Sequence, residues 1–252
     1  MKIAVAGGTG TVGRHVVAAA EHRGHVVSVL SRPRGVDVST GQGLKEALTG
    51  IDVVIDVTNT MTLFASTARR FFETSTRHLL EAERNAGVRH HVALSIVGID
   101  GMDASYYAGK LAQERAIADG SVPYTIARAA QFHEFAGQML ADAKGPIAII
   151  PRMLMRPVAA RDVGAHLVHV AEGSPSIRAM DLVGPRDEVL ADLARRQLTH
   201  EGRRQRVFEL RLPGAYGRGL ASGKLRGSGE FRQASMTFDE WLTADDHRPL
   251  RR

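Results

Sequence analysis

The start of the chain combines an apolar strand, a glycine-rich loop and a helix. Residues 3–6 (IAVA) are an unbroken apolar run, which is typical of a strand buried in a parallel sheet. The loop GGTGTVG follows at residues 7–13, and an apolar-periodic helix comes directly after it. Gly7 allows a tight turn, Gly10 leaves bare backbone beside an anion, and Gly13 lets the helix and the strand pack closely. Because amide groups at the helix start would face that anion, the segment predicts a dinucleotide pyrophosphate site; a purely structural turn is the alternative.

The second strand indicates which dinucleotide is bound. Residues 25–30 (HVVSVL) form this strand, and an acid at its end would bind the ribose 2′-hydroxyl of NAD. The chain has SRPR at residues 31–34 and no acid there. A guanidinium binds a 2′-phosphate through paired charged hydrogen bonds. We therefore predict NADP(H) as the preferred cofactor and Arg32 as its 2′-phosphate contact. Arg34 is a second candidate for this contact. NAD(H) is the alternative cofactor, and an Arg32 that is merely solvated in a loop is the non-functional alternative.

The composition excludes several classes of protein. The 252 residues include no cysteine, which excludes disulfides and cysteine-ligated metal, and no apolar run approaches the roughly 20 residues of a membrane span. The N-terminus becomes glycine-rich too soon for a signal peptide, so we expect a cytoplasmic enzyme with no membrane partner. The net charge is +6, and residues 195–252 hold 13 basic and 7 acidic side chains. These basic residues are scattered and few aromatic residues accompany them, so we expect a solvated face and no nucleic-acid partner.

Strands and helices alternate along the first 150 residues. After the opening unit, strands are expected at 52–57, 92–97 and 124–127, and helices at 43–48, 65–86 and 106–118. This alternation predicts an α/β fold with a doubly wound parallel sheet, whose ligands lie beyond the carboxyl ends of the strands. We predict that residues 1–150 form a dinucleotide-binding domain.

The later part of the chain is less regular. Strands are expected at 147–150 and 179–183, and helices at 162–171 and 189–198. We predict a smaller C-terminal substrate region over residues 151–252, partly interleaved with the first domain. Residues 213–229 are rich in glycine, arginine and serine, which indicates either a mobile loop near the substrate mouth or an inert surface loop.

Three polar residues near the expected strand and helix ends fit reductase chemistry. Ser95 lies near the carboxyl end of a strand, and Tyr106 and Lys110 lie four residues apart on one face of the next helix. Reduction of a carbonyl needs a hydride on carbon and a proton on oxygen; the tyrosine can supply the proton, while the serine hydroxyl holds the oxygen. Lowering the tyrosine pKa from about 10 by roughly 3 units takes about 4 kcal/mol of preferential phenolate stabilisation. The lysine and the positive ring of an oxidised nicotinamide are the expected sources, and a half-buried tyrosine beside an extended lysine is the structural alternative.

Together these segments resemble a known family. The motifs that carry the resemblance are GGTGTVG, LSIVGID, YYAGKLAQERAI, PYTIARAAQFHEF, PVAARDVGAHLVHVA, DLVGP and TFDEWL. They are similar to the atypical branch of the short-chain dehydrogenase/reductases, close to NmrA-like and NAD(P)H-binding proteins, over nearly the whole chain. The resemblance implies a Rossmann fold. It also implies Tyr106 as the acid/base, Lys110 as the residue that binds the nicotinamide ribose, and Ser95 as the group that polarises the substrate.

The expected cofactor site combines the glycine loop with residues that the resemblance implies. Thr58 and Asn59 match the strand end that lines the cofactor, and Ala130 matches the loop near the nicotinamide. The full set of expected cofactor contacts is Gly7, Thr9, Gly10, Thr11, Val12, Gly13, Ser31, Arg32, Asp37, Thr58, Asn59, Lys110 and Ala130.

Two features depart from the family pattern. Tyr107 follows Tyr106 and lies within reach of Lys110, so it is an alternative proton donor. The segment between Arg34 and Gly43 is also short for the third strand that the family usually has. Residues 36–38 are interpreted as a remnant of this strand, with Asp37 on the adenine amino group.

Apolar residues after the strand ends predict the substrate pocket. Met61, Phe132, His133 and Met139 are its expected contacts, because loops after strand ends line such sites. Each apolar residue has a place in the core as its alternative, and His133 has a structural role as its alternative. The 11 histidines show no zinc-binding spacing, so we expect no metal site.

These features favour an enzyme that reduces a small molecule. The leading hypothesis is an NADPH-dependent reductase of a small, mostly apolar carbonyl, enone or quinone. A non-catalytic NADP(H) sensor of the NmrA-like kind is an alternative, although a Tyr, Lys and Ser set has no purpose there. A nucleotide-sugar epimerase or dehydratase is a further alternative, although this chain is short for that class. The sequence predicts no oligomeric state.

Overall fold

The computed structural model describes residues 1–143 and 145–247, and it divides into two compact units. Unit 1 contains Met1–Ser95, Asp103–Arg128 and Val163–Met180. Unit 2 contains Ile96–Met102, Ala129–Asp162 and Asp181–Arg252. Each unit is thus assembled from several stretches of chain. The predicted division into functional domains at residue 150 remains a prediction, and its last residues, 248–252, lie outside the described part.

A parallel sheet forms the centre of unit 1. Its strands lie in the order β2-β1-β3-β4-β5, with β8 beside β5, and the pairs β1–β2, β1–β3, β3–β4 and β5–β8 are parallel. The predicted α/β fold with a mostly parallel sheet is therefore confirmed. The strands are β1 (Lys2–Ala6), β2 (Val26–Leu30), β3 (Val53–Asp56), β4 (His90–Ile96), β5 (Tyr124–Ala129) and β8 (Ile177–Arg178).

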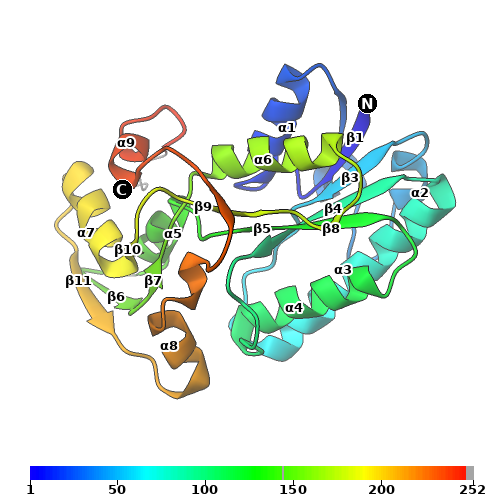
Figure 1. Cartoon of the computed structure of the whole chain (residues 1–252). Coiled ribbons are helices and arrows are strands. Elements are labelled where there is room, and N and C mark those ends of the chain that lie inside the picture. Colours follow the sequence, from blue (N-terminus) through cyan, green and yellow to red (C-terminus); the bar gives the residue numbers. More distant parts are fainter. Residues whose placement is uncertain (144, 248–252) are drawn as a thin grey trace. The chain divides into compact units, whose positions relative to one another are not determined.

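Helices cover both faces of this sheet, as Figure 1 shows. The helices α1 (Gly13–His22) and α6 (Ala160–Glu172) lie on one face, and α3 (Ala65–Ala86) and α4 (Ser105–Ala118) lie on the other. Two short helices, η1 (Arg32–Arg34) and α2 (Leu44–Ala47), follow β2. The helix α1 buries the stripe Gly13, Val16 and Ala20, as its apolar periodicity predicted, whereas α4 is buried over the continuous run of residues 107–113.

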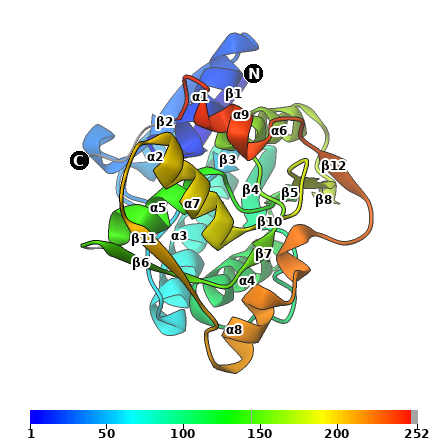
Figure 2. The same cartoon turned by 90° about the vertical axis from the view of Figure 1, so that its left-hand side faces the viewer.

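Unit 2 contains three short strand pairs. The strands β6 (Ile147–Pro151) and β11 (Arg206–Leu210) are parallel, and so are β9 (Asp181–Val183) and β12 (Phe231–Gln233). The strands β7 (Leu154–Met155) and β10 (Glu188–Val189) are antiparallel. Figure 2 shows β6 and β11 beside α7 (Leu190–His200), which packs on α5 (Glu134–Asp142). The helix α9 (Phe238–Leu242) begins with a capping box between Thr237 and Glu240.

The expectation of a loop over residues 213–229 is wrong. The helix α8 (Gly214–Ala221) and the short helix η2 (Lys224–Arg226) occupy most of this segment. Two of its glycines allow close packing: a Cβ at Gly217 would overlap the carbonyl oxygen of Leu212, and one at Gly219 would lie 2.8 Å from Met102 Cε. Gly223, with a φ of 80°, separates the two helices.

A glycine also sets how closely α3 and α4 approach. A Cβ at Gly109 in α4 would lie 2.7 Å from both Ala68 Cβ and Phe72 Cδ2 in α3. In an open helix interior, Gly→Ala stabilises by about 1 kcal/mol, whereas an added methyl in a packed site destabilises by about 1–3 kcal/mol.

We therefore expect Gly109→Ala to lower the free energy of unfolding by about 1–3 kcal/mol, because the two helices must separate. Urea unfolding followed by circular dichroism measures this change. Gly173→Ala is the matched control, since its nearest contact would be 3.4 Å away and its effect should stay within about 0.5 kcal/mol. A Gly109→Ala protein as stable as the parent would show that a methyl group fits between α3 and α4, and would contradict the packing argument.

Candidate functional site

The glycine loop brings bare backbone to the carboxyl edge of the sheet in unit 1. Gly7 takes a φ of 80°, and a Cβ there would lie 2.9 Å from the Val57 carbonyl oxygen. A Cβ at Gly13 would overlap the Gly7 carbonyl oxygen, so only glycine lets the first turn of α1 approach β1 this closely. Val12 precedes α1 and makes no side-chain cap. The Arg14 and His15 amides already donate to the Gly10 and Val12 carbonyls at 3.1 and 2.9 Å, so an anion here would be met by the loop amides that precede them.

Two buried hydroxyls lie at the same edge. Ser31 directly follows β2, and Thr58 lies two residues after the end of β3. Ser31 Oγ and Thr58 Oγ1 are both buried and have no hydrogen-bond partner within residues 1–143 and 145–247. Buried polar atoms without partners are rare in folded proteins. Their presence beside the glycine loop fits a site built to receive the polar groups of a nucleotide.

Two exposed basic residues follow β2 in a short helix. Arg32 and Arg34 begin and end η1, and both are exposed. Thr9, Gly10 and the half-buried Thr11 form the accessible part of the glycine loop. No acid stands between β2 and η1. The geometry therefore leaves a guanidinium next to the strand end, where the ribose of a bound dinucleotide belongs.

The expected strand remnant at residues 36–38 does not form. Asp37 makes only an isolated bridge with Gln42, because its side chain closes a local turn. Its Oδ1 accepts hydrogen bonds from the Ser39 amide (2.9 Å) and hydroxyl (2.7 Å). These hydrogen bonds, together with the nearby Arg32, hold the pKa of Asp37 below its ordinary value. Its contact with adenine stays a prediction.

Tyr106 lies in the first turn of α4, and its hydroxyl points to a strand end. The phenol donates a hydrogen bond to Asn59 Oδ1 at 2.7 Å, which joins two residues predicted for the site. Its ring packs edge-to-face on Phe72 and on the buried Tyr107. Burial, reinforced by the negative charge of Asp56, raises the pKa of Tyr106 above its ordinary value. The lowering that we expect from Lys110 together with the positive ring of an oxidised nicotinamide stays a prediction.

Lys110 lies one turn further along α4, but its ammonium has other partners. Lys110 is 3% exposed, its Nζ donates to Gln113 Oε1, and the ammonium lies 4.7 Å from the centre of the Phe72 ring. Burial lowers the pKa of Lys110 to about 8, although the carboxylates of Asp56 and Glu114 act in the opposite direction. The helical spacing thus brings both residues to one region, while their polar atoms bind different groups.

Ser95 is engaged in a buried ion pair. Its hydroxyl donates to Glu114 Oε1 at 2.5 Å, and Arg128 from β5 binds the same carboxylate at 2.8 and 2.6 Å. Such a two-pronged guanidinium contact fixes both partners. In this arrangement the Ser95 hydroxyl is bound to Glu114. A hydrogen bond to substrate would require the serine side chain to rotate away from that carboxylate.

Several residues of this site were missed by the sequence analysis. Asp56, Gln113, Glu114 and Arg128 together surround Lys110 and Ser95. Spacing offered a signal only for Gln113 and Glu114, which follow Lys110 by three and four residues on the same helix. A single acid at the end of an apolar strand, such as Asp56, gives no such signal.

The remaining predicted contacts belong to other places. Met61 in unit 1 is 70% exposed, after β3. In unit 2, Ala130 is buried and its amide donates to the Leu182 carbonyl at 2.8 Å, while Phe132 and Met139 are half-buried. His133 is 1% exposed; its ring packs on Phe238 and Trp241, and its Nε2 lies 3.1 Å from the Met236 carbonyl oxygen. This is the structural role that the sequence analysis weighed for His133.

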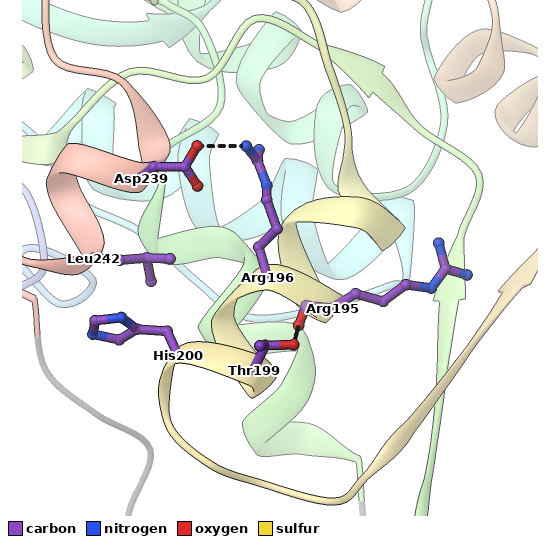
Figure 3. A pocket seen from close by; sticks show the side chains of 6 residues that line it. All are labelled: Arg195, Arg196, Thr199, His200, Asp239 and Leu242. Carbon is purple, nitrogen blue, oxygen red and sulfur yellow. Dashed lines mark hydrogen bonds and ion pairs between the residues drawn. The ribbon is translucent and has the colours of Figure 1, made fainter.

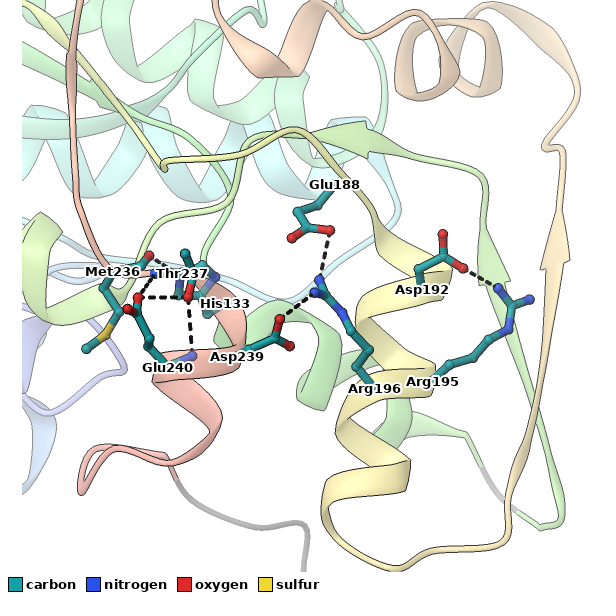
Figure 4. A network of polar contacts seen from close by, with 9 residues as sticks. All are labelled: His133, Glu188, Asp192, Arg195, Arg196, Met236, Thr237, Asp239 and Glu240. Atoms are coloured by element: carbon teal, nitrogen blue, oxygen red, sulfur yellow. Dashed lines mark hydrogen bonds and ion pairs between the residues drawn. The ribbon is translucent and has the colours of Figure 1, made fainter.

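A pocket in unit 2 lies on α7 and α9, apart from all predicted contacts. Its lining is shown in Figure 3 and consists of Arg195, Arg196, Thr199, His200, Asp239 and Leu242. Its cations are already paired: Arg196 binds Asp239 (3.0 Å) and Glu188 (2.8 Å), and Arg195 binds Asp192 (2.6 Å), as Figure 4 shows. This charge pairing joins α7 to α9 and leaves little attraction for an anion.

The described residues offer neither a metal site nor a membrane-spanning helix. Residues 1–143 and 145–247 contain no cluster of three or more His, Asp or Glu side chains that could hold a metal ion. Within the same residues, no helix combines the length and the apolar character needed to cross a bilayer.

Comparison with known proteins decides the family. A family model described as NAD(P)H-binding matches residues 7–170, which include the glycine loop, Tyr106 and Lys110. The chain belongs to this NAD(P)H-binding family. The matched segment runs from the glycine loop through nearly the whole of α6, so the family covers all strands of unit 1 except β1 and β8.

Relatives of this NAD(P)H-binding protein include a curated reductase. The (4-alkanoyl-5-oxo-2,5-dihydrofuran-3-yl)methyl phosphate reductase of Streptomyces griseus is 33% identical over 144 residues, which cover 52% of this chain and 48% of the relative. The chain therefore spans about half the length of the curated relative that it matches.

Two solved structures share the fold. A short-chain dehydrogenase/reductase superfamily protein from Agrobacterium tumefaciens with bound NAD has a TM-score of 0.67 and 18% identity, covering 96% of this chain and 95% of that one. Triphenylmethane reductase of Citrobacter sp. complexed with NADP(H) has a TM-score of 0.67 and 15% identity, covering 91% and 93%. The first holds NAD and the second NADP(H), so the shared fold accepts both cofactors.

The buried His133 predicts a pH dependence of stability. Burial lowers its pKa to about 4, whereas the unfolded value is about 6.5. Below pH 6.5 the unfolded chain therefore binds a proton that the folded protein does not. Full stability from this group is present above pH 6.5, and up to about 3 kcal/mol is lost as the pH falls toward 4.

We expect the His133→Gln variant to lose less stability than the parent between pH 6.5 and 4, because the glutamine does not titrate. Chemical unfolding at several pH values measures the two slopes. His22→Gln, at an exposed histidine of α1, is the control and should follow the parent. Parallel slopes for the parent and His133→Gln would contradict the burial argument.

Proposed function

We propose that this protein is an NADPH-dependent reductase of a small, mostly apolar carbonyl, enone or quinone. The observation that carries the proposal is the Tyr106 phenol, which is kept protonated at a strand end and hydrogen-bonded to Asn59. It belongs to the same unit as the glycine loop and the two unpartnered hydroxyls. The reductase relative supports the reaction class.

The residues divide the binding of the nucleotide between them. The backbone amides of the glycine loop bind the pyrophosphate, and Ser31 and Thr58 donate their free hydroxyls to the ribose and phosphate oxygens. Arg32 binds the 2′-phosphate, which favours NADPH over NADH. Bound NADPH supplies the hydride.

The chain itself supplies the proton. Reduction requires a proton donor that is protonated at neutral pH, and the raised pKa of Tyr106 meets this requirement. As negative charge develops on the substrate oxygen, the phenol hydroxyl turns from Asn59 Oδ1 and donates its proton there. Lys110 provides a positive charge on the same face of α4, and this charge favours the phenolate that remains.

We expect an apolar substrate, because the residue predicted to contact it in unit 1 is apolar. Met61, the predicted substrate contact in unit 1, is exposed and offers adaptable apolar surface without charge. An apolar contact of this kind favours a carbonyl, enone or quinone with a hydrocarbon body over a sugar nucleotide, whose phosphates need cations.

We expect Tyr106→Phe to bind NADPH with unchanged affinity and to lose at least about 100-fold in kcat, because the proton donor is removed while the ring packing remains. NADPH oxidation across a quinone and enone panel, with calorimetry for binding, measures both. Tyr107→Phe is the matched control and should retain turnover. Full activity in Tyr106→Phe and loss in Tyr107→Phe would transfer the role to Tyr107. Tight NADPH binding without turnover in the parent would favour the sensor.

We expect Arg32→Ala to weaken NADPH binding by about tenfold or more and to leave NADH binding nearly unchanged, because only NADPH carries the 2′-phosphate. Titration calorimetry with both nucleotides measures the ratio. Arg34→Ala shows whether the second arginine shares the contact, and Arg84→Ala, at an exposed position near the end of α3, is the control. Equal weakening of both nucleotides would remove Arg32 from the 2′-phosphate.

A further inference from the structure

A buried chain of hydrogen bonds connects β3 to Lys110 within unit 1. Asp56, the last residue of β3, is fully buried. Its Oδ1 accepts the Thr58 amide at 2.8 Å, and its Oδ2 accepts Gln113 Nε2 at 2.8 Å. Gln113 Oε1 in turn accepts the Lys110 ammonium. The carboxylate and the ammonium thus hold opposite ends of one amide group.

The chemistry of the three groups allows one orientation of this amide. An ionised carboxylate only accepts hydrogen bonds, and an ammonium only donates them. Gln113 must therefore present its NH₂ to Asp56 and its oxygen to Lys110. If the Asp56 charge is lost, only the ammonium still favours this orientation, and the buried positive charge loses the counter-charge at the other end of the amide. Asp56 consequently controls Lys110 although the two are not in direct contact.

The surroundings leave Asp56 as the carboxylate that acts on Lys110. Glu114 also attracts the ammonium, but Arg128 and Ser95 already bind its carboxylate. On the neighbouring β4, His91 is paired with Glu83 of α3 at 2.8 Å. Burial alone would lower the pKa of His91, but Glu83 and Asp56 raise it. The charge of Glu83 is therefore directed to its partner His91 rather than to Lys110.

We propose that Asp56 and Gln113 are positioning residues, which keep the buried Lys110 charged and its ammonium bound inside unit 1, one helical turn from Tyr106. Burial disfavours the charged form of a lysine, so the ammonium needs a buried counter-charge to persist at neutral pH. The catalytic consequence rests on the proposed reductase function. The charge state of Lys110 itself does not depend on that function, because it follows from the contacts of Asp56, Gln113 and Lys110 alone.

The test uses the small number of lysines in the chain. There are five: Lys2, Lys45, Lys110, Lys144 and Lys224. Lysine labelled with ¹³C at Cε then gives five NMR signals in the full chain, and Lys110→Arg identifies the signal of Lys110. Each signal is followed as the pH rises from 6 to 11, in the absence of nucleotide and substrate.

We expect the Lys110 signal of the parent to titrate well below the other four, and Asp56→Asn to lower its midpoint further by about one unit or more. Gln113→Met, which keeps the volume but cuts the bridge, should lower the midpoint in the same direction. Asp52→Asn is the matched control, because Asp52 precedes the same strand and pairs with Arg89 at 2.8 Å. An unmoved Lys110 midpoint in folded Asp56→Asn and Gln113→Met would overturn the proposal.

A second readout separates this inference from the reductase itself. We expect the alkaline limb of kcat for NADPH oxidation to shift to lower pH in Asp56→Asn by the same amount as the NMR midpoint. A midpoint that moves while the rate profile does not would overturn the positioning role. A parent that binds NADPH and turns over no substrate would instead refute the reductase, and the lysine titration would still decide whether Asp56 holds the charge.

Discussion

The absence of side chains at Gly7 and Gly13 is the constraint on which the nucleotide end of unit 1 depends. These two positions let the first turn of α1 lie directly on the turn that leaves β1, at a distance that a Cβ would forbid. The amides of the glycine loop, the Ser31 hydroxyl after β2 and the Thr58 hydroxyl after β3 then meet at one edge of the sheet. Packing and ligand binding therefore use the same feature, because an anion can be held by backbone only where no side chain stands in front of it.

The face of the sheet that α3 and α4 cover contains several buried charged residues. Asp56, Lys110, Glu83, His91 and Arg128 are all enclosed between the strands and the helices α3 and α4. Buried charges persist only when they are paired and hydrogen-bonded. Gly109 lets α4 pack closely against α3. In this packing the Lys110 ammonium lies over the Phe72 ring, and Gln113 donates a hydrogen bond to Asp56. The helix packing thus creates the electrostatic setting of Tyr106.

Much of unit 1 could be predicted from the sequence. The strands β1 to β5 and the helices α1, α3 and α4 follow from apolar runs, helical periodicity and glycine stops, all of which are local signals. The glycine loop predicted nucleotide binding, and the family match supports it. Unit 2 was less predictable. The strand β11 is mostly exposed and polar at its start, and the glycines of α8 predict a loop although Gly217 and Gly219 allow close packing of a helix.

The sequence by itself determined the alternation of elements, the glycine loop, the arginines after β2 and the helical spacing of Tyr106 and Lys110, because each is a matter of neighbours along the chain. Only the tertiary structure decided what those side chains touch. The phenol binds Asn59, the ammonium binds Gln113, which in turn binds Asp56, and the Ser95 hydroxyl binds Glu114. The tertiary structure also raised the pKa of Tyr106, since burial and the charge of Asp56 arise from residues about fifty positions away. Spacing sets which residues share a face, whereas burial and long-range pairing set their protonation.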